Sequence, residues 1–199
     1  MSRFKHLVFT EPVRAVQREQ GSGRAFKEEN RAEPLTGAEA AFIQERDGCY
    51  LATVGETGWP YIQHRGGPPG FVHVLDEHRI AFADVRGNRQ YVTTGNLRAD
   101  DRIALIFMDY PHQRRLKVLG RATELAVDAD PALAARLTGH GTGGRAERLF
   151  VVRVEGFDWN CPQHITPRFS EAELAPVWTR LDELEQENAD LRAQLLARE

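Results

Sequence analysis

The sequence has only two cysteines among its 199 residues, and it contains no long apolar run. Cys49 and Cys161 lie far apart and form no Cys-x-x-Cys pair, so a disulfide scaffold is not expected. No apolar stretch approaches the roughly eighteen residues that a transmembrane helix needs. The N-terminus also lacks the apolar core and cleavage site of a signal peptide. We therefore expect a cytoplasmic protein that does not enter a membrane.

Excess positive charge is also missing. Lysine and arginine number 26 against 29 aspartates and glutamates, and the formal net charge is −3. A protein that binds nucleic acid usually carries a basic field, so no nucleic-acid partner is expected. The length fits one domain with appendages, and a hydrophobic content of 41% is enough to bury a core.

Seven short segments rich in β-branched and aromatic residues alternate with turn residues, which predicts seven strands. The segments are residues 49–54, 60–65, 71–75, 79–84, 102–110, 116–125 and 149–157. Because most of the connections are short, we expect an antiparallel barrel or sandwich. The predicted fold class is mainly β (α+β).

Three stretches predict helices beside these strands. Thr36 and Glu39 have the spacing of a capping box. Asn88 is placed to cap a helix within NRQYVTTGNLRAD. Asp130 and Pro131 mark the start of a third helix, since proline is favoured at the first helical position.

The two ends of the chain differ from its centre. Residues 11–34 are polar and charged, which predicts an extended arm or a mobile loop. The C-terminal part carries apolar residues at alternating steps of three and four, the seam of a coiled coil. The seam is Leu174, Val177, Leu181, Leu184, Asn188, Leu191 and Leu195. One asparagine in such a seam is typical of parallel two-stranded coils, and a single helix packed on its own domain is the alternative.

The stretch DVRGNR, residues 84–89, places two arginines where a strand leads into a helix. Gly87 permits a tight turn or a positive φ. Free N–H groups at a helix start, with Arg86 and Arg89 beside them, would hold a phosphate. A solvated surface turn is the alternative.

A second cluster is YIQHRGGPPG. Strand alternation directs Tyr61, Gln63 and Arg65 to one face, and Ile62 and His64 to the other. Two glycines follow, which would let a flat ligand approach the backbone. The alternative is a glycine-rich hairpin turn with an exposed arginine.

A third cluster, HQRRLKVLGRATE, opens a strand with basic residues. Gln113 and Arg115 share one face, and Arg114 shares the other with Leu116. Basic residues at this place also suit an edge strand, where they prevent aggregation.

The fourth cluster, FDWNCPQHITPRF, concentrates hydrogen-bonding groups and an indole in a short loop. A segment that covers a ligand is one interpretation, and a structural loop is another. Cys161 and His164 also suggest a metal site or a nucleophile pair, but two ligands do not make a zinc site and no oxyanion hole is evident.

The sequence resembles the pyridoxamine 5'-phosphate oxidase-like family of FMN-binding split β-barrels in four segments and in their order. The segments are HRGG, FADVRGNRQ, QRRLKVLGRA and the late tryptophan segment. The resemblance covers roughly residues 36–170. It implies an antiparallel split β-barrel with flanking helices and a homodimer that binds FMN at the subunit interface. The chain would then divide into an N-terminal arm (1–35), an FMN-binding barrel (36–170) and a C-terminal helix with coiled-coil-like heptads (171–199).

The resemblance also implies roles for individual residues. Arg65 would meet the flavin ring or ribityl chain, and Arg86 and Arg89 would hold the phosphate with Asn88. The implied cofactor-binding set is His64, Arg65, Gly66, Val85, Arg86, Asn88, Arg89, Gln90, Gln113, Arg114, Trp159, Asn160, Cys161 and Gln163. No metal is implied. His164 is the catalytic candidate, as a proton shuttle, and the alternative is a histidine bonded to its own loop.

The sequence departs from true pyridoxamine 5'-phosphate oxidases. In those enzymes a lysine follows the first arginine motif, whereas RGGPPG follows it in this sequence. Their phosphate turn reads Ser–Arg–Lys, whereas the turn here reads RGNRQ. WNCPQHITPR offers only His164 and Arg168, in a different frame. A B6 vitamer is therefore not the expected substrate.

The expected function is that of an FMN-dependent oxidoreductase acting on a small molecule. The alternatives are a flavin carrier or redox sensor with a partner-binding coil, an F420-dependent reductase, and an interaction module without cofactor. Because no GxGxxG nicotinamide-binding segment is present, a separate reductase is a further expected partner.

Overall fold

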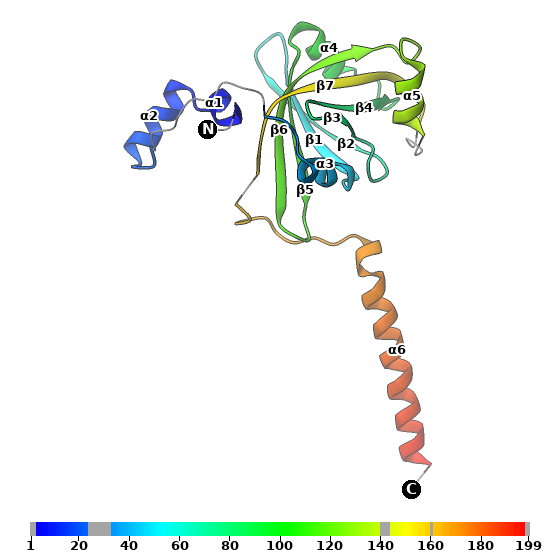
Figure 1. The fold of residues 1–199 in the computed structure, drawn as a ribbon. Coiled ribbons are helices and arrows are strands. Elements are labelled where there is room, and N and C mark those ends of the chain that lie inside the picture. The colour runs from blue at the N-terminus through cyan, green and yellow to red at the C-terminus, as the bar shows by residue number, and fades with distance from the viewer. Residues whose placement is uncertain (1–2, 24–32, 140–143, 160, 198–199) are drawn as a thin grey trace. The chain divides into compact units, whose positions relative to one another are not determined.

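The computed structural model describes residues 3–23, 33–139, 144–159 and 161–197 (Figure 1). The chain forms two compact units. The first comprises Met1–Asp109 and Arg114–Pro162, and the second comprises Tyr110–Gln113 and Gln163–Glu199.

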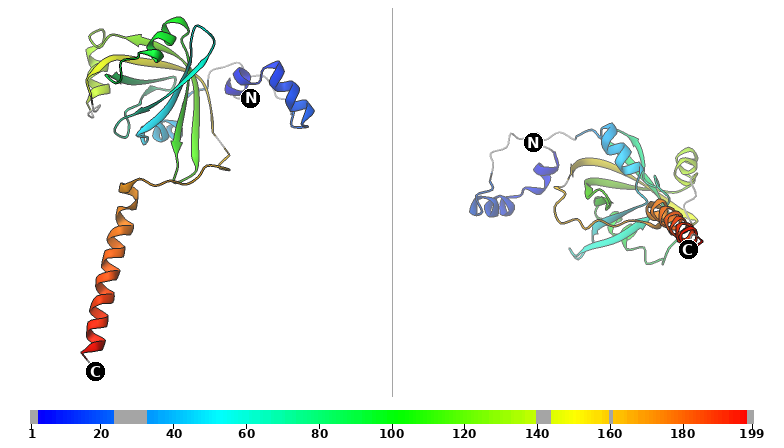
Figure 2. Two further views of the ribbon diagram at one scale, coloured as in Figure 1. Left: turned by 180° about the vertical axis from the view of Figure 1, so that it is seen from behind. Right: turned by 90° about the horizontal axis from the view of Figure 1, so that it is seen from below.

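The first unit contains one antiparallel sheet of seven strands, which are all seven of the predicted strands. They are β1 (Gly48–Val54), β2 (Pro60–Gly66), β3 (His73–Asp76), β4 (Arg79–Val85), β5 (Arg102–Asp109), β6 (Arg114–Leu125) and β7 (Ala146–Trp159). Their order is β2-β1-β5-β6-β7-β4-β3, and the sheet is strongly curved (Figure 2).

The curvature brings β2, at one edge of the sheet, close to β4 near the other edge. These two strands are not hydrogen-bonded neighbours in the sheet. They meet through side chains, since Arg65 Nη1 lies 2.9 Å from Asp84 Oδ1. The fold is therefore an antiparallel split β-barrel with flanking helices, as predicted.

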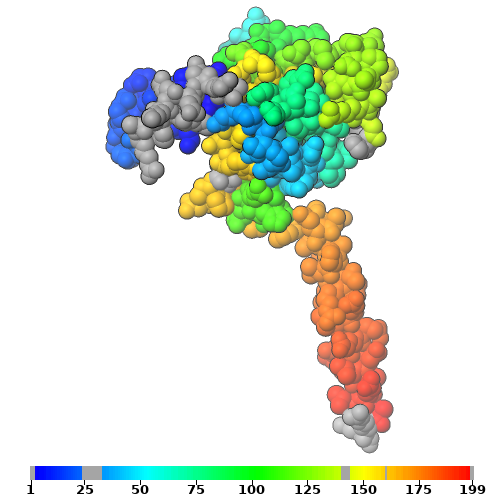
Figure 3. All heavy atoms as spheres, in the orientation of Figure 1, coloured from blue at the N-terminus to red at the C-terminus, as the bar shows by residue number. Residues whose placement is uncertain are grey.

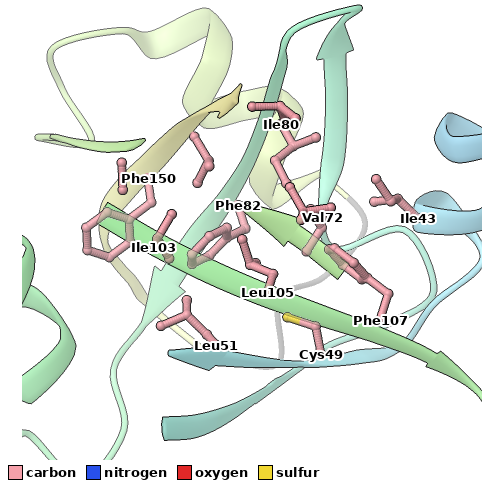
Figure 4. Packing of buried hydrophobic residues seen from close by; sticks show 14 of the residues in the cluster. Ile43, Cys49, Leu51, Val72, Ile80, Phe82, Ile103, Leu105, Phe107 and Phe150 are labelled. Carbon is pink, nitrogen blue, oxygen red and sulfur yellow. The ribbon is translucent and has the colours of Figure 1, made fainter. Parts of the chain in front are cut away.

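Alternation along the strands explains how the core fills. In β5, Ile103, Leu105 and Phe107 point inward at every second position. Figure 4 shows them packed with Phe82 and Phe150 from the facing strands. Full burial of such side chains contributes about 1.5–3 kcal/mol each.

Helices α3 (Gly37–Gln44) and α5 (Pro131–Thr138) lie on the outside of this unit (Figure 3). Thr36 and Glu39 form the predicted capping box at α3. Asp130 caps α5 as predicted, because its Oδ1 accepts a hydrogen bond of 2.9 Å from Leu133 N. Both helices therefore begin where the sequence places their caps.

The prediction of an extended arm or mobile loop over residues 11–34 is wrong for α2 (Glu11–Glu19). A helix for which the sequence analysis made no prediction, α1 (Arg3–Val8), precedes it. Phe4 is buried, and α1 packs on β7, where a Cβ added at Gly156 would lie 2.6 Å from Phe4 N. A packed aromatic residue thus supports α1, and a proline in the first turn favours the start of α2. Residues 24–32 of the predicted arm lie outside the described residues.

In the second unit, α6 (Glu171–Leu196) is one continuous helix of 26 residues over the predicted heptads. It starts at a capping box in which Glu173 Oε2 accepts hydrogen bonds of 2.8 Å from Ser170 N and Ser170 Oγ. None of the described helices is long and apolar enough to cross a membrane.

We expect Gly120→Ala to destabilise the barrel. Gly120 lies at a register shift between β6 and β7, where an added Cβ would lie 2.6 Å from both Arg153 O and Val152 Cγ1. Overpacking of this kind costs about 1–3 kcal/mol in the free energy of unfolding, which denaturant titration measures.

Gly95→Ala is the matched control for this experiment. It lies in α4 (Val92–Ala99), where an added Cβ meets no described atom within 4 Å. Alanine favours a helix over glycine by up to about 1 kcal/mol, so this variant should be as stable as the parent or more so. Equal stability of the two variants would contradict the close packing at Gly120.

Candidate functional site

The connection between β4 and α4 is a tight turn with unusual backbone angles. Arg89 (φ 62°) and Tyr91 (φ 55°) both occupy the left-handed region. Such conformations cost about 1–3 kcal/mol each outside glycine, so the surrounding contacts must hold them. Asn88 Oδ1 accepts a hydrogen bond of 3.1 Å from Gln90 N, and Arg86 N donates to Arg145 O at 2.9 Å.

The prediction that Asn88 caps the following helix is wrong. Helix α4 begins at Val92, with Tyr91 in the N-cap position and no side-chain cap. The left-handed residues Arg89 and Tyr91 prevent an earlier start, so Asn88 closes the turn instead. The first N–H groups of α4, which have no acceptor within the helix, therefore face the turn uncapped.

This corner borders a small concavity of about 40 Å³, which we call the α4 pocket. Its wall is formed by Tyr61, Gln63 and Arg65 of β2, the end of β4, the turn, the first residues of α4, and Glu147. The predicted alternation in β2 is thus observed. Five residues of the predicted cofactor-binding set line the pocket together: Arg65, Val85, Asn88, Arg89 and Gln90.

Asp84 is the buried charge behind the pocket. Its carboxylate lies 2.9 Å from Arg65 Nη1 and 2.5 Å from Arg148 Nη1, and the Asp84 side chain is only 6% exposed. Arg148 also lies 3.4 Å from Glu124 Oε1 and 3.5 Å from Glu147 Oε2, so it has three acidic partners. Arg65 Nε is buried and has no hydrogen-bond partner in the described part of the chain.

Arg148 of β7 connects this ion group to the turn. Its Nη1 donates to Thr94 Oγ1 of α4 at 3.3 Å, and its guanidinium carbon lies 4.9 Å from the centre of the Tyr91 ring. A second link comes from Thr93 Oγ1, which donates to Gln63 Oε1 of β2 at 3.2 Å. Strand β2, strand β7 and the start of α4 are therefore held together by polar side chains.

Arg86 does not line the α4 pocket, although the sequence groups it with Arg89. Its Nε lies 3.9 Å from Glu147 Oε1. With Arg89, Arg145 and Arg148 it lines a neighbouring concavity, which we call the arginine groove. The groove and the pocket share Arg89, Tyr91 and Glu147.

His64 and Gly66 lie away from the α4 pocket. His64 is on the opposite face of β2, where its ring centre is 5.5 Å from that of Tyr50 in an edge-to-face contact. A Cβ added at Gly66 would lie 3.1 Å from His64 Cε1. The structure therefore groups these two residues with each other.

Arg114 and Trp159 form a separate cluster with α3. The guanidinium carbon of Arg114 lies 4.8 Å from the Trp159 ring centre and 5.1 Å from that of Phe42. Trp159 Nε1 donates to Glu39 Oε1 at 2.7 Å. Burial raises the pKa of Glu39, but hydrogen bonds from Thr36 and Trp159 outweigh it and hold the pKa below its usual value. In this structure Trp159 anchors α3 to the end of β7.

The remaining predicted residues lie outside these clusters. Gln113, Gln163 and His164 belong to the second unit, where Gln113 Nε2 donates to Ile165 O at 2.6 Å. Cys161 is exposed, and Asn160 lies outside the described residues. Among the residues described, no group of three or more His, Cys, Asp or Glu side chains could hold a metal ion.

Sequence reasoning missed several residues of the site, among them Asp84, Tyr91, Thr94, Glu147 and Arg148. Asp84 gave a usable signal, since it is a charged residue that directly follows the apolar run IAFA of its strand. Arg148 gave none, because it is 64 residues away from Asp84 along the chain.

Comparison with protein families gives one match: the family model described as pyridoxamine 5'-phosphate oxidase matches residues 35–157. No curated protein matches the chain.

Solved structures similar to this chain include HupZ of Group A Streptococcus. It is 16% identical, with a TM-score of 0.52 over 68% of this chain and 99% of HupZ. A second HupZ structure gives 17% identity, a TM-score of 0.52, and coverage of 63% and 98%. The Mycobacterium tuberculosis protein Rv2991 is 19% identical, with a TM-score of 0.48 over 72% of this chain and 96% of Rv2991. At these identities the HupZ likeness shows a shared fold.

We expect Asp84→Asn to destabilise the protein strongly, because it leaves Arg65 and Arg148 without their shared counter-charge. Breaking a buried ion group costs about 3–5 kcal/mol in the free energy of unfolding. The control is Asp76→Asn, which removes an exposed partner of Arg79 and should cost far less. If denaturant titration finds equal losses, the ion group is not a structural element.

Proposed function

Because this chain belongs to the pyridoxamine 5'-phosphate oxidase family, we propose that it is an FMN-binding flavoprotein and an oxidoreductase for a small molecule. The observation that carries the proposal is the α4 pocket, where uncapped helix N–H groups, Arg89 and Arg65 converge at the split between β2 and β4.

The phosphate of FMN would lie at the start of α4. The N–H groups of Thr93 and Thr94 and the positive end of the helix dipole favour an anion there. Arg89 adds a charged donor beside them, and a hydrogen bond with Tyr91 raises the pKa of Arg89. Arg86 would contribute only at longer range, since it contacts Glu147.

Arg65 fits the ribityl chain or the flavin ring. Its Nη1 is occupied by Asp84, but its buried Nε needs an acceptor, which a polar group of the cofactor would supply. The bound flavin would supply the electron-transfer chemistry. The chain contributes placement and charge: the guanidinium of Arg65 would stabilise a flavin that gains negative charge on reduction.

A homodimer would complete the site, with the flavin at the subunit interface. The α4 pocket, at about 40 Å³, is much smaller than the roughly 300–1,000 Å³ of small-molecule sites, so one chain alone does not enclose a flavin. On the opposite face of the edge strand β2 from the pocket, Tyr50 and Ile62 are exposed, and Trp59 before β2 is 78% exposed. We propose that a second copy covers this surface and the flavin ring, in a cytoplasmic dimer that receives electrons from a separate reductase.

A deazaflavin, F420, is a second candidate cofactor. F420 carries a long anionic tail, which requires a basic surface beyond the phosphate site. The arginine groove provides one, because Arg86, Arg145 and Arg148 line it together with Arg89. FMN has no group that would extend into this groove.

We expect Arg89→Ala to lower the preference for FMN over riboflavin. The loss of one charged hydrogen bond to the phosphate, about 1.5–3 kcal/mol, should reduce that preference by about tenfold or more. Riboflavin affinity should change little, because riboflavin lacks the phosphate. Fluorescence titration of the purified apoprotein with each flavin measures both dissociation constants.

The control is Arg79→Ala, an exposed arginine of β4 that pairs with Asp76 outside the pocket. It should leave both affinities unchanged. A wild-type protein that binds FMN no better than riboflavin, or an Arg89→Ala protein that keeps the full preference, would refute the phosphate site. Titration with F420 in the same assay decides between the two cofactors.

A further inference from the structure

Helix α6 carries an apolar stripe that nothing in its own unit covers. None of its residues, all of which the structure describes, is buried, and Val177, Leu184, Leu191 and Leu195 are between 45% and 64% exposed. At 1.5 Å per residue, the helix is about 39 Å long. Because an amphipathic helix gains most of its stability by packing its apolar face, α6 requires a partner.

We propose that α6 pairs with α6 of a second copy of this chain as a parallel, in-register, two-stranded coiled coil. The proposal is independent of flavin binding. Its core layers follow from the heptads: position a holds Leu174, Leu181, Asn188 and Leu195, and position d holds Val177, Leu184 and Leu191.

Asn188 determines the alignment. In a parallel pair without offset, Asn188 faces its counterpart, and the two amides can hydrogen-bond to each other. An offset of one heptad, or an antiparallel arrangement in which a faces d, would place each amide against leucine or valine. An unpaired buried amide is unfavourable, which is how one asparagine at position a specifies register and the two-stranded state.

The charges beside the seam favour the same arrangement. In a parallel pair, position g of one helix faces position e of the next heptad on the other. This places Arg180 opposite Glu185 and Glu187 opposite Arg192, and the symmetry of the pair doubles both contacts. Both are attractive, so a second copy is a complementary partner for this face.

The contacts within the single helix do not compete strongly with this pairing. Arg180 Nη1 lies 2.9 Å from Glu183 Oε2, and both side chains are more than half exposed. Exposed ion pairs at this spacing contribute little to stability, so Arg180 can exchange Glu183 for the facing glutamate.

A disulfide test in the full chain measures the arrangement directly. In a Cys161→Ser background, Asn188→Cys places a thiol at position a, facing its counterpart. Ala189→Cys, at the neighbouring position b, is the matched control on the outer face. Cys49 remains silent, because burial raises its pKa to about 12.

Under mild oxidation, the Asn188→Cys chain should shift from 22.5 kDa to twice that mass on non-reducing gels, and the Ala189→Cys chain should remain a monomer there. Equal cross-linking of the two variants, or none with either, would overturn the proposal. A dimer held together by the barrel alone would cross-link both variants to the same extent. The difference between the two variants therefore tests the coiled coil independently of the proposed flavin site.

Charge exchange tests the flanking contacts. Arg180→Glu with Arg192→Glu makes every facing pair negative, and Glu185→Arg with Glu187→Arg makes every pair positive. In the Cys161→Ser, Asn188→Cys background, each double variant alone should cross-link less than the parent. A mixture of the two should restore cross-linking as a heterodimer; a mixture that stays as weak as its components would contradict the assigned contacts.

Discussion

The carboxylate of Asp84, buried between Arg65 and Arg148, is the interaction on which the candidate site depends. Strands β2 and β4 share no backbone ladder, so side chains must join the two sides of the split barrel. One carboxylate that serves two arginines links β2, β4 and β7 at the same point. A polar junction of this kind leaves room for a ligand, whereas a hydrogen-bonded strand pair would close the barrel.

The same junction explains the strained turn beside it. Arg148 also contacts the Tyr91 ring and Thr94, and thereby supports a left-handed residue and the first turn of α4. The helix then starts without a side-chain cap, and its N–H groups remain available at the pocket. The backbone angles of the turn and the buried ion group thus shape one corner, which is where we propose that the phosphate binds.

The strands and two helix starts could be predicted from the sequence because they depend on local patterns. Period-two alternation identifies β5, and the cap of α5 needs only Asp130 and Pro131. The start of α4 could not be predicted in this way, because the contact between Tyr91 and Arg148 joins residues that are far apart in the chain. Helix α1 was missed for a similar reason, since Phe4 is stabilised by packing on β7. The contact between β2 and the pocket was predicted only in part. Alternation placed Arg65 on the face of β2 that lines the α4 pocket, but Asp84 was not identified as its buried partner.

A crystal structure of the protein with FMN tests the central claim most directly. The account predicts the phosphate within hydrogen-bonding distance of the N–H groups at the start of α4 and of Arg89, with Arg65 Nε donating to the ribityl chain or the ring. A phosphate bound elsewhere, with Arg65 Nε still without a partner, would contradict it.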